Sequence, residues 1–545
     1  MRGRKLRSCG RSVNLKNAMG GQQSKFFWMR KSRGMILQEI SPFSWPYKIF
    51  TEGGTSSHDG GVPRSVRGNF MAKLLLQKVY TVSKKHSAPR LWLQHLVCET
   101  AQFKPGEDLF VRVDEDEKTI VIQNKPFEEE GDVHEIHVSS RVNRISGEPR
   151  PLVDTCGVRY TSVLCVQDKI EISVYRHDGY SQVIVRPLRY RLFEEESFEA
   201  PSDQRISLLS LCAGAGIGTA IFCDTQAYTA VMEVEIEEDS ASVLKHNFPH
   251  SYLFNGDLRD CHITAKADVA FVTLSCTESS TLGDGGEGYF DNVILGSFKI
   301  LKSAEPRVIF FENVPSFYNS RPFKDLRELL STDYPYWVGP IRIDSYHFGS
   351  IAKRDRSYAL CMREREDFES FRIPEPPAFR RKKLKEYLDP KGTEHEWKPL
   401  DKWMASFQSK AEKNNSWADR SIEKTFVDPD TCTQLQCIPR RYRSHSASNS
   451  YVLNEDQTKW RFLSVSELRR IFEIPDWFEF PKHIPVYRIY EMIGQSVCGR
   501  VIRAFANEIA TMFFRRYAKQ TQAKRERDLP FNLTMDNGGQ IGFLI

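Results

Sequence analysis

The chain has 545 residues, of which 40% are hydrophobic and 27% charged, with a formal net charge of +6. A chain this long exceeds one ordinary hydrophobic core, so we expect two or three soluble domains. No apolar run reaches the roughly 18 residues of a membrane-spanning helix. The twelve cysteines lack paired zinc-site spacing, so we expect reduced thiols, no metal and a cytoplasmic protein.

The first 70 residues are basic and contain the Gly/Ser stretch TEGGTSSHDGGVPRS. This composition is typical of linkers, and it lacks the apolar segment of a secretory signal. We predict that residues 1–70 are a disordered or non-native extension and that order begins near Met71.

Residues 72–192 show short alternating runs with polar turns, a pattern typical of β-hairpins. The run LFVRV-DEDEK-TIVIQ is echoed by IEISV-YRHDGYS-QVIV, and PRLWL at Pro89 by PRPLV at Pro149. Two matches at about one spacing predict an internal duplication. The pattern resembles the swapped-hairpin AbrB/SymE-like modules, which bind nucleic acid; a β-rich interaction or spacer domain is the alternative.

A polar stretch, EEESFEAPSDQ, predicts a linker, and beyond it apolar strands alternate with helical patterns. This alternation predicts an α/β domain with a mostly parallel sheet over residues 205–363. Its first strand, ISLLSL, leads into Gly214 and Gly216 at the start of a helix. Glycines there permit a tight turn that lets a ligand approach the backbone. No phosphate-binding lysine follows them, which disfavours a P-loop.

The next two strands end in acidic residues. Glu235 follows the glycines by about 20 residues, the spacing at which an acid accepts hydrogen bonds from ribose hydroxyls. Glu233 competes for this role, although its spacing fits less well. Asp257 ends the third strand and either reads an adenine amino group or caps a turn. These strand ends predict a nucleoside-bearing cofactor, either a dinucleotide or S-adenosylmethionine.

The following strand ends carry candidate catalytic groups. Cys276 follows the apolar run DVAFV, and Glu312 with Asn313 follows VIFF. Arg354 and Arg356 begin a later strand two residues apart, so both should face one side. A cysteine alone is more often a buried packing residue, but a thiol beside a carboxylate pairs a nucleophile with an acid.

The order of these motifs along the chain resembles that of the DNA cytosine-5 methyltransferases. It runs from the glycine turn and the strand-end acids to Cys276, Glu-Asn-Val and Arg-x-Arg. Two C-terminal segments resemble the family's ninth and tenth motifs, namely RFLSVSELRRIFEIPDWFEFP and YEMIGQSVCGRVIRAFANEIA. The resemblance therefore spans about Ser207 to Phe514. It implies a Rossmann-like S-adenosylmethionine-dependent methyltransferase fold with a small target-recognition domain. It assigns the cofactor to Ala213, Gly214, Gly216, Glu235, Asp257 and Ser496.

The resemblance also implies roles for four catalytic residues. Cys276 would add to carbon 6 of a flipped-out cytosine, Glu312 would hold ring N3 and the amino group, and Arg354 would stabilise the adduct. Arg356 either joins them or forms a structural ion pair.

Several positions depart from the family pattern. Leu274-Ser275-Cys276-Thr277 replaces Pro-Pro-Cys-Gln. Cys212 replaces an aromatic residue and Ser210 an acid. Ile351-Ala352 replaces Pro-Gln, and Gln495 replaces asparagine.

The resemblance divides the remaining chain into a target-recognition region at 364–448, the C-terminal part of the catalytic domain at 449–520 and a tail at 521–545. It implies a nucleoid-associated enzyme that acts on double-stranded DNA as a monomer, with a restriction endonuclease as a possible partner. An RNA cytosine-5 methyltransferase and a non-catalytic DNA-binding regulator are the alternatives.

Overall fold

The computed structural model describes residues 72–128, 131–189, 196–199, 204–274, 289–413, 422–527, 533–535 and 541–543. The expected extension at 1–70 and Cys276 both lie outside these described residues. Within them, no helix combines the length and the apolarity that crossing a bilayer demands.

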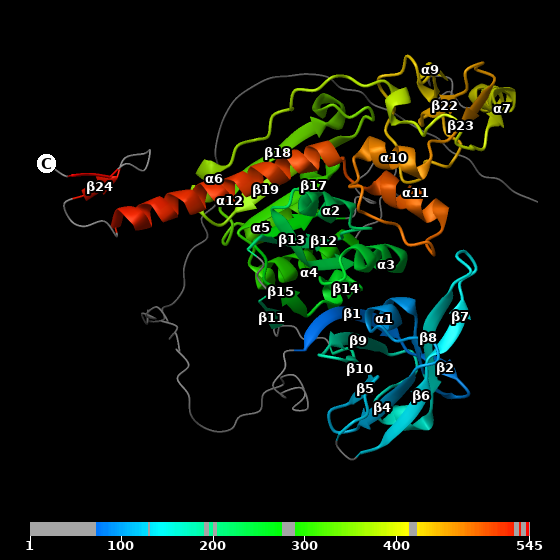
Figure 1. The fold of residues 1–545 in the computed structure, drawn as a ribbon, viewed down its shortest axis with the longest axis vertical. Helices are drawn as coiled ribbons and strands as arrows, with labels where there is room; N and C mark the ends of the chain where they lie inside the picture. Colours follow the sequence, from blue (N-terminus) through cyan, green and yellow to red (C-terminus); the bar gives the residue numbers. More distant parts are fainter. Residues whose placement is uncertain are drawn as a thin grey trace, which may run out of the picture. The chain divides into compact units, whose positions relative to one another are not determined.

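Seven strands form the sheet of the α/β domain (Figure 1). Their spatial order is β18 (Tyr336–Asp344), β19 (Asp355–Met362), β17 (Val308–Asn313), β16 (Val269–Val272), β12 (Ile206–Leu211), β13 (Tyr228–Glu235) and β14 (Tyr252–Asn255). The last five are parallel, whereas β19 runs antiparallel to both β17 and β18. The predicted mostly parallel α/β sheet is therefore confirmed.

Helices cover both faces of this sheet, because alternate residues of its strands enter two separate cores. In β17, Val308 and Phe310 belong to the core that includes residues of α2 (Ile217–Asp224), α3 (Glu238–Asn247) and α12 (Gly499–Arg527). Ile309 and Phe311 belong to the core that includes residues of α4 (Tyr289–Ala304) and α5 (Arg321–Leu330). The strands are thus buried on both sides, as their continuous apolar runs indicate.

Residues 72–189, here called the N-terminal module, contain two successive sets of elements with the same order of strands, called copies below; their origin by duplication stays a prediction. The first comprises β1 (Lys73–Thr81), β2 (Ser83–Lys85), β3 (Ala88–Leu93), α1 (His95–Thr100), β4 (Asp108–Asp114) and β5 (Thr119–Gln123). The second comprises β6 (Val133–His137), β7 (Ser139–Val142), β8 (Pro149–Cys156), η2 (Val158–Ser162), β9 (Lys169–Arg176) and β10 (Ser181–Pro187).

The two copies exchange strands. β1 pairs with β9 of the second copy, β6 pairs with β4 of the first, and β3–β8 and β5–β10 join the copies across the centre. The hairpins β4–β5 and β9–β10 lie where the sequence repeat predicts them. The likeness to AbrB/SymE-like modules stays a prediction.

The module and the α/β domain share one continuous sheet, which the sequence did not indicate. β1 pairs in parallel with β14, with Leu76 opposite Leu253 and Lys78 opposite Asn255, so the whole sheet has thirteen strands. Behind this seam, the Tyr252 hydroxyl donates a 2.6 Å hydrogen bond to Oε1 of buried Gln77. β1 therefore covers the edge of β14 that would otherwise be open.

The predicted linker carries a short strand of its own. β11 (Glu196–Phe198) pairs in parallel with β15 (Ile263–Ala265), so part of the connection is attached to the α/β domain.

The recognition region contains α7 (Leu400–Lys413) and α9 (Ile422–Thr425) around a four-stranded sheet. The strands are β20 (Lys398–Pro399), β23 (Lys459–Arg461), β22 (Tyr451–Leu453) and β21 (Phe426–Val427). Two of them follow residue 448, so the small sheet uses residues beyond the predicted boundary. The remaining elements are η3 (Leu258–Asp260), η4 (Pro315–Asn319), η5 (Ser345–Phe348), α6 (Arg365–Ser370), η6 (Leu384–Tyr387), α10 (Val465–Phe472), α11 (Val486–Gln495), β24 (Leu533–Met535) and β25 (Ile541–Phe543).

Candidate active site

The glycine turn, residues 212–216, connects β12 to α2. Gly214 and Gly216 have φ values of 57° and 84°, which favour glycine, and a Cβ at Gly216 would collide with Leu244. Within the same turn, Ala213 donates its N–H to the Val234 carbonyl oxygen at 3.1 Å. The turn is thereby fixed against β13, the strand that ends in Glu235.

Glu235 lies against the glycine turn. Its Oε2 accepts a 2.7 Å hydrogen bond from the Gly214 N–H, and its Oε1 accepts one of 2.8 Å from the Glu237 N–H. Burial raises the pKa of this carboxyl, while these hydrogen bonds oppose the rise. A carboxylate oxygen accepts more than one hydrogen bond, so each oxygen retains capacity for a ribose hydroxyl.

Glu233, the competing acid, is bonded to Ser251, the residue just before β14. It is 1% exposed, accepts a hydrogen bond from the Ser251 hydroxyl and lies near Lys245. Burial raises the pKa of Glu233 to about 7. Of the two acids, Glu235 is the one that contacts the glycine turn, and its ribose role stays a prediction.

Asp257 and Ser496 are engaged locally. Asp257 caps η3 by accepting a 3.0 Å hydrogen bond from the Arg259 N–H, and it also pairs with the Arg259 guanidinium at 2.6 Å. Ser496 follows α11 and donates its hydroxyl to the Ile493 carbonyl oxygen at 2.7 Å. Both readings of Asp257 therefore remain open, since a capping carboxylate keeps spare lone pairs.

Glu312 and the two arginines form a buried charged cluster where β17 meets β19. Oε1 of Glu312 lies 3.2 Å from Nε of Arg356. Arg354 is 5% exposed and donates to the Gly494 carbonyl oxygen at 3.1 Å. Both guanidinium groups act on Glu312 electrostatically, so the structure brings together three of the four predicted catalytic residues.

Two polar atoms of this cluster are left without hydrogen-bond partners among the described residues. They are Oε1 of Glu312, whose contact with Arg356 lacks hydrogen-bond geometry, and Nε of Arg354. Burial raises the pKa of Glu312 even though Arg356 and Arg354 oppose the rise. Burial and the neighbouring Arg356 lower the pKa of Arg354. Unpaired buried groups of this kind are costly in a protein and suit a site that a ligand completes.

Asn313 anchors the chain just before Cys276. Its Nδ2 donates a 3.0 Å hydrogen bond to the carbonyl oxygen of Leu274. The Thr273 hydroxyl donates to the Cys212 carbonyl oxygen at 3.0 Å, which ties the same segment to the glycine turn. The sequence motif named Asn313 but did not reveal this anchoring contact.

These side chains follow neighbouring parallel strands at one edge of the sheet. The glycine turn follows β12, Glu235 ends β13, Leu274 follows β16 and Glu312 lies near the end of β17. In open α/β sheets, ligands bind at the carboxyl ends of the strands. Ile236, which sequence reasoning missed, also lies at this edge and is 56% exposed. An apolar residue between two acids was the only signal for it.

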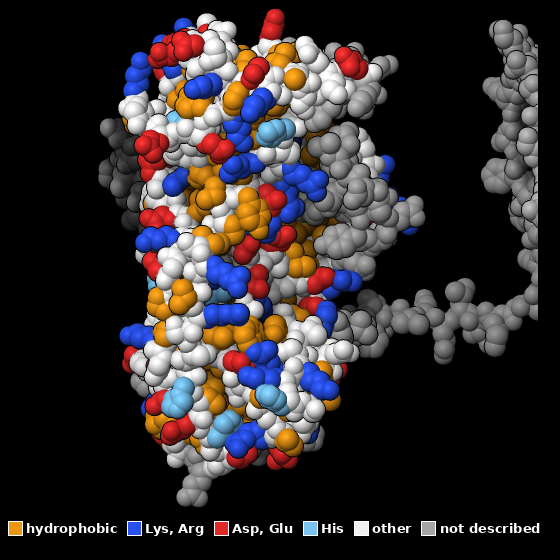
Figure 2. Space-filling view, turned by 90° about the vertical axis from the view of Figure 1, so that its right-hand side faces the viewer, with side chains coloured by type: hydrophobic (Ala, Val, Ile, Leu, Met, Phe, Trp, Pro, Cys, Tyr) orange, Lys and Arg blue, Asp and Glu red, His pale blue; other side chains and the backbone are white. Residues whose placement is uncertain are grey.

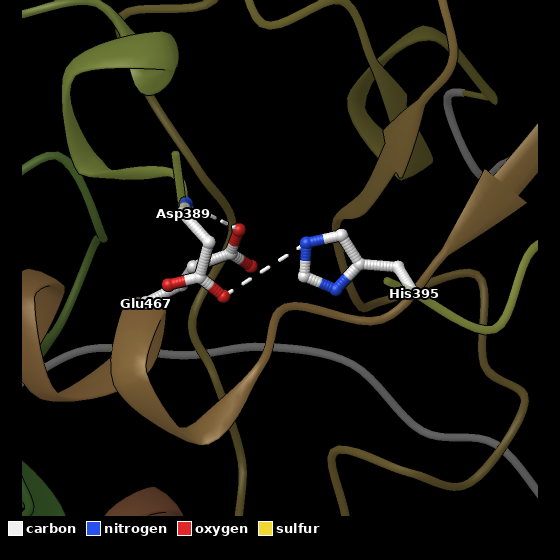
Figure 3. Close-up of side chains that lie close together, drawn as sticks. All are labelled: Asp389, His395 and Glu467. Carbon is white, nitrogen blue, oxygen red and sulfur yellow. Dashed lines mark hydrogen bonds and ion pairs between the residues drawn. The ribbon is translucent and has the colours of Figure 1, made fainter. Parts of the chain in front are cut away.

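Asp389, His395 and Glu467 form a separate cluster between the recognition region and α10 (Figure 3). His395 Nε2 lies 3.9 Å from Asp389 Oδ2. The spacing of these groups would suit a metal, but protein donors already occupy the carboxylate oxygens. Arg461 donates to both oxygens of Glu467 at 2.7 Å, and Asp389 accepts from Ser464, Ser466 and Arg470.

These bonds connect the recognition region to the start of α10. Burial opposes the shift, but the hydrogen bonds from Ser464, Ser466 and Arg470 lower the pKa of Asp389 to about 2. Ser464 and Glu467 also form a capping box for α10. The cluster thus has a structural explanation that requires no cation.

The basic run RRKKLK, Arg380 to Lys385, is partly neutralised. In RRKKLK, Arg380 pairs with Glu386 and Lys385 with Asp430. On the face shown in Figure 2, Lys and Arg side chains are interspersed with Asp and Glu. That face therefore carries both signs of charge.

Comparisons with known proteins place these features in context. A family model described as C-5 cytosine-specific DNA methylase matches residues 206–511. No curated protein matches the chain. Similar solved structures include the methyltransferase EhMeth of Entamoeba histolytica, at 16% identity and a TM-score of 0.46, covering 57% of this chain and 99% of that one.

Two further similar structures are DNMT2 proteins. A DNMT2 mutant of Spodoptera frugiperda is 16% identical with a TM-score of 0.44, and covers 56% of this chain and 99% of that one. The Dnmt2 methyltransferase of S. pombe is 17% identical with a TM-score of 0.41, and covers 57% and 99%. The family match itself includes the glycine turn, Glu235, Glu312, both arginines and Ser496.

Proposed function

The chain belongs to the C-5 cytosine-specific DNA methylases, and from that premise we propose that it methylates carbon 5 of a flipped-out cytosine in double-stranded DNA. The observation that carries this proposal is the buried Glu312, which meets Arg354 and Arg356 beside the anchored Leu274. A planar base with a ring nitrogen and an amino group offers partners for Oε1 of Glu312 and Nε of Arg354, which are unpaired among the described residues.

The chemistry requires a nucleophile because carbon 5 of cytosine is unreactive by itself. In our proposal the Cys276 thiolate adds to carbon 6, and the ring electrons move toward N3 and onto carbon 5. Carbon 5 would then take up a methyl group from bound S-adenosylmethionine, which would leave as S-adenosylhomocysteine. A base then removes the carbon 5 proton, and the electron pair of that bond expels the Cys276 thiolate from carbon 6.

Glu312 suits the N3 position because its pKa is raised by burial. A carboxyl that keeps its proton donates a hydrogen bond to N3, and its second oxygen accepts one from the cytosine amino group. Nε of Arg354, unpaired among the described residues, offers a donor for the same adduct. The Arg354 side chain is held by its hydrogen bond to the Gly494 carbonyl oxygen before substrate arrives, so this donor needs little reorganisation during reaction.

The residues at the carboxyl edge fit S-adenosylmethionine as the methyl donor. Glu235 retains acceptor capacity for the ribose hydroxyls, and the glycine turn exposes backbone at the start of α2. Ile236 provides an exposed apolar side chain for the adenine ring, and Asp257 an acceptor for its amino group.

The test is covalent trapping on DNA that contains 5-fluorocytosine, with S-adenosylmethionine present. The fluorine cannot leave as a proton does, so we expect a stable protein–DNA adduct. Cys276→Ala should abolish it, whereas the control Cys165→Ala, at an exposed cysteine of the N-terminal module, should leave it unchanged. DNA binding without an adduct or methyl transfer would instead support the non-catalytic regulator.

The same trap on RNA of matched sequence tests the substrate polymer. RNA cytosine presents the same carbon 5, so the reaction itself does not distinguish the two polymers. We expect the adduct on DNA; an adduct formed only on RNA would replace our proposal by the RNA alternative.

A further inference from the structure

The N-terminal module adds β1 beside β14, so that the carboxyl end of β1 joins the row of strand carboxyl ends to which we assign the cofactor. β1 runs parallel to β14, with Lys78 opposite Asn255. The carboxyl end of β1, which includes Tyr80, therefore continues along the same edge that carries Glu235 and Asp257. In a parallel sheet this is the edge where ligands bind.

A cavity of about 420 Å³ lies at this junction. The α/β domain lines it with Ile236, Gly256 and Asp257, and the module lines it with Lys78, Tyr80 and Trp92. The volume is within the range of small-molecule sites, roughly 300–1,000 Å³. Two of its lining residues, Ile236 and Asp257, are those that the proposed function gives to the adenine ring.

The walls of the cavity combine flat apolar groups with acceptors. Trp92 and Tyr80 offer aromatic rings, Ile236 an exposed aliphatic side chain and Asp257 a carboxylate. Lys78 is paired with Glu238 at 3.0 Å, so its charge is already balanced. A purine ring with an exocyclic amino group suits these walls better than a phosphate does.

The Trp92 ring is held in place by the module itself. The Arg90 guanidinium lies over it, 3.8 Å from the ring centroid. Asp154 in turn fixes Arg90 through hydrogen bonds of 2.7 Å and 2.9 Å. A side chain supported in this way is pre-organised, which reduces the entropy lost when a ligand binds against it.

We propose that the N-terminal module forms one wall of the cofactor site, with Trp92 and Tyr80 lining its adenine end across from Ile236 and Asp257. The inference rests on the proposed function, because it takes S-adenosylmethionine as the ligand. It makes cofactor affinity a joint property of the module and the α/β domain.

Calorimetric titration of the full chain with S-adenosylhomocysteine tests this inference. We expect Trp92→Ala to raise the Kd about tenfold, as expected when stacking on a base is lost, and Trp92→Phe to restore most of the affinity. Leu152→Ala is the control, because Leu152 takes the place of Trp92 in the second copy of the repeat and does not line the cavity. A folded Trp92→Ala chain with wild-type Kd would overturn the inference, whereas a wild-type chain that binds no S-adenosylhomocysteine would refute the proposed function.

Photolabelling tests whether the module contacts the adenine ring even if Trp92→Ala does not fold. An 8-azidoadenine analogue of S-adenosylhomocysteine, irradiated with the wild-type chain, should label peptides within residues 78–94 as well as the α/β domain. Labelling confined to residues 206–274 would show that the module does not reach the adenine ring.

Discussion

At the scale of single residues, Glu312 shows how a buried carboxyl is prepared for a substrate. It is 8% exposed and has two cationic neighbours, yet its Oε1 accepts no hydrogen bond from the described residues. A protein that needed the cluster only for stability would gain by satisfying that oxygen. The unsatisfied oxygen is therefore better explained by a ligand than by packing.

Replacing Glu312 with glutamine tests its role as a proton-bearing group. The amide has nearly the same shape but cannot hand a proton to N3, so we expect methyl transfer to fall by about 100-fold or more. Glu305→Gln is the matched control, since Glu305 is a surface residue paired with Lys266. Initial rates of tritiated methyl transfer to DNA measure the effect, and similar rates for both variants would contradict the assigned role.

Asn313 is a positioning residue, because its side chain binds the backbone of Leu274, two residues before Cys276. Asn313→Ala removes the hydrogen bond to the Leu274 carbonyl oxygen. We expect kcat and the yield of the 5-fluorocytosine adduct to fall about tenfold or more, with the Kd for S-adenosylhomocysteine unchanged. Equal losses in adduct yield and cofactor affinity would indicate general damage to the sheet edge instead.

At the scale of elements, the seam between the module and the α/β domain contains two half-buried histidines. The rings of His95 in α1 and His483 before α11 have centroids 5.4 Å apart. Burial, with Arg150 nearby, lowers the pKa of His95 to about 3 and that of His483 to about 4. His246 and Lys78 add positive charge around this pair, and Asp239 and Glu148 add negative charge.

These pKa values predict that acid weakens the seam. Both folded-state values lie below the ordinary value of about 6.5, so the separated elements bind protons first as the pH falls. The stability that the two neutral histidines contribute is complete above about pH 6.5 and is lost as the pH falls through their folded-state pKa values of about 4 and about 3. Amide hydrogen exchange in β1 should accelerate relative to β17 between pH 7 and pH 5, and His95→Phe should reduce this acceleration.

The hydrogen bond between Tyr252 and Gln77 joins β14 to β1 within the core. Tyr252→Phe leaves the side-chain Oε1 of Gln77 without this donor, so we expect the free energy of unfolding to fall by about 1–3 kcal/mol. Urea denaturation measures the change. Tyr517→Phe, at a side chain that is 69% exposed on α12, should change the stability little.

Some of these elements and contacts could be predicted from the sequence, and others could not. The parallel strands, the glycine turn and the acids at strand ends were predictable because buried strands and tight turns leave local signals. The pairing of β1 with β14 was not, because Leu76 and Leu253 are distant in sequence and either strand could have paired elsewhere. The contact from Asn313 to Leu274 was hidden for the same reason. The strands after residue 448 were missed because β22 and β23 are only three residues long each.

At the scale of the whole molecule, the sheet connects two units that the sequence describes separately. The ladder between β1 and β14 is accompanied by part-buried contacts such as the hydrogen bond from Lys245 Nζ to the Leu75 carbonyl oxygen, at 2.9 Å. Unpaired strand edges promote aggregation, so the α/β domain depends on β1 to cover β14.

This dependence predicts complementation between two separate pieces. Residues 204–545 expressed alone should be poorly soluble, and co-expression with residues 72–189 should restore a soluble pair that co-purifies. Leu76→Pro in the module should prevent the rescue, because proline removes the N–H group and disturbs the β1 ladder. A soluble and active 204–545 fragment would show that the seam is dispensable.

The exchanged strands of the module leave it with two equivalent outer edges, of which β14 occupies one. The other belongs to β6, which is only five residues long and exposes Val133, Glu135 and His137, with His134 and Ile136 half-buried between them. Short, charged strands deter further pairing. The first strand of one copy thus joins the module to β14, whereas the first strand of the other ends the sheet. Substitutions that lengthen β6 or remove its charge should cause the protein to polymerise edge to edge.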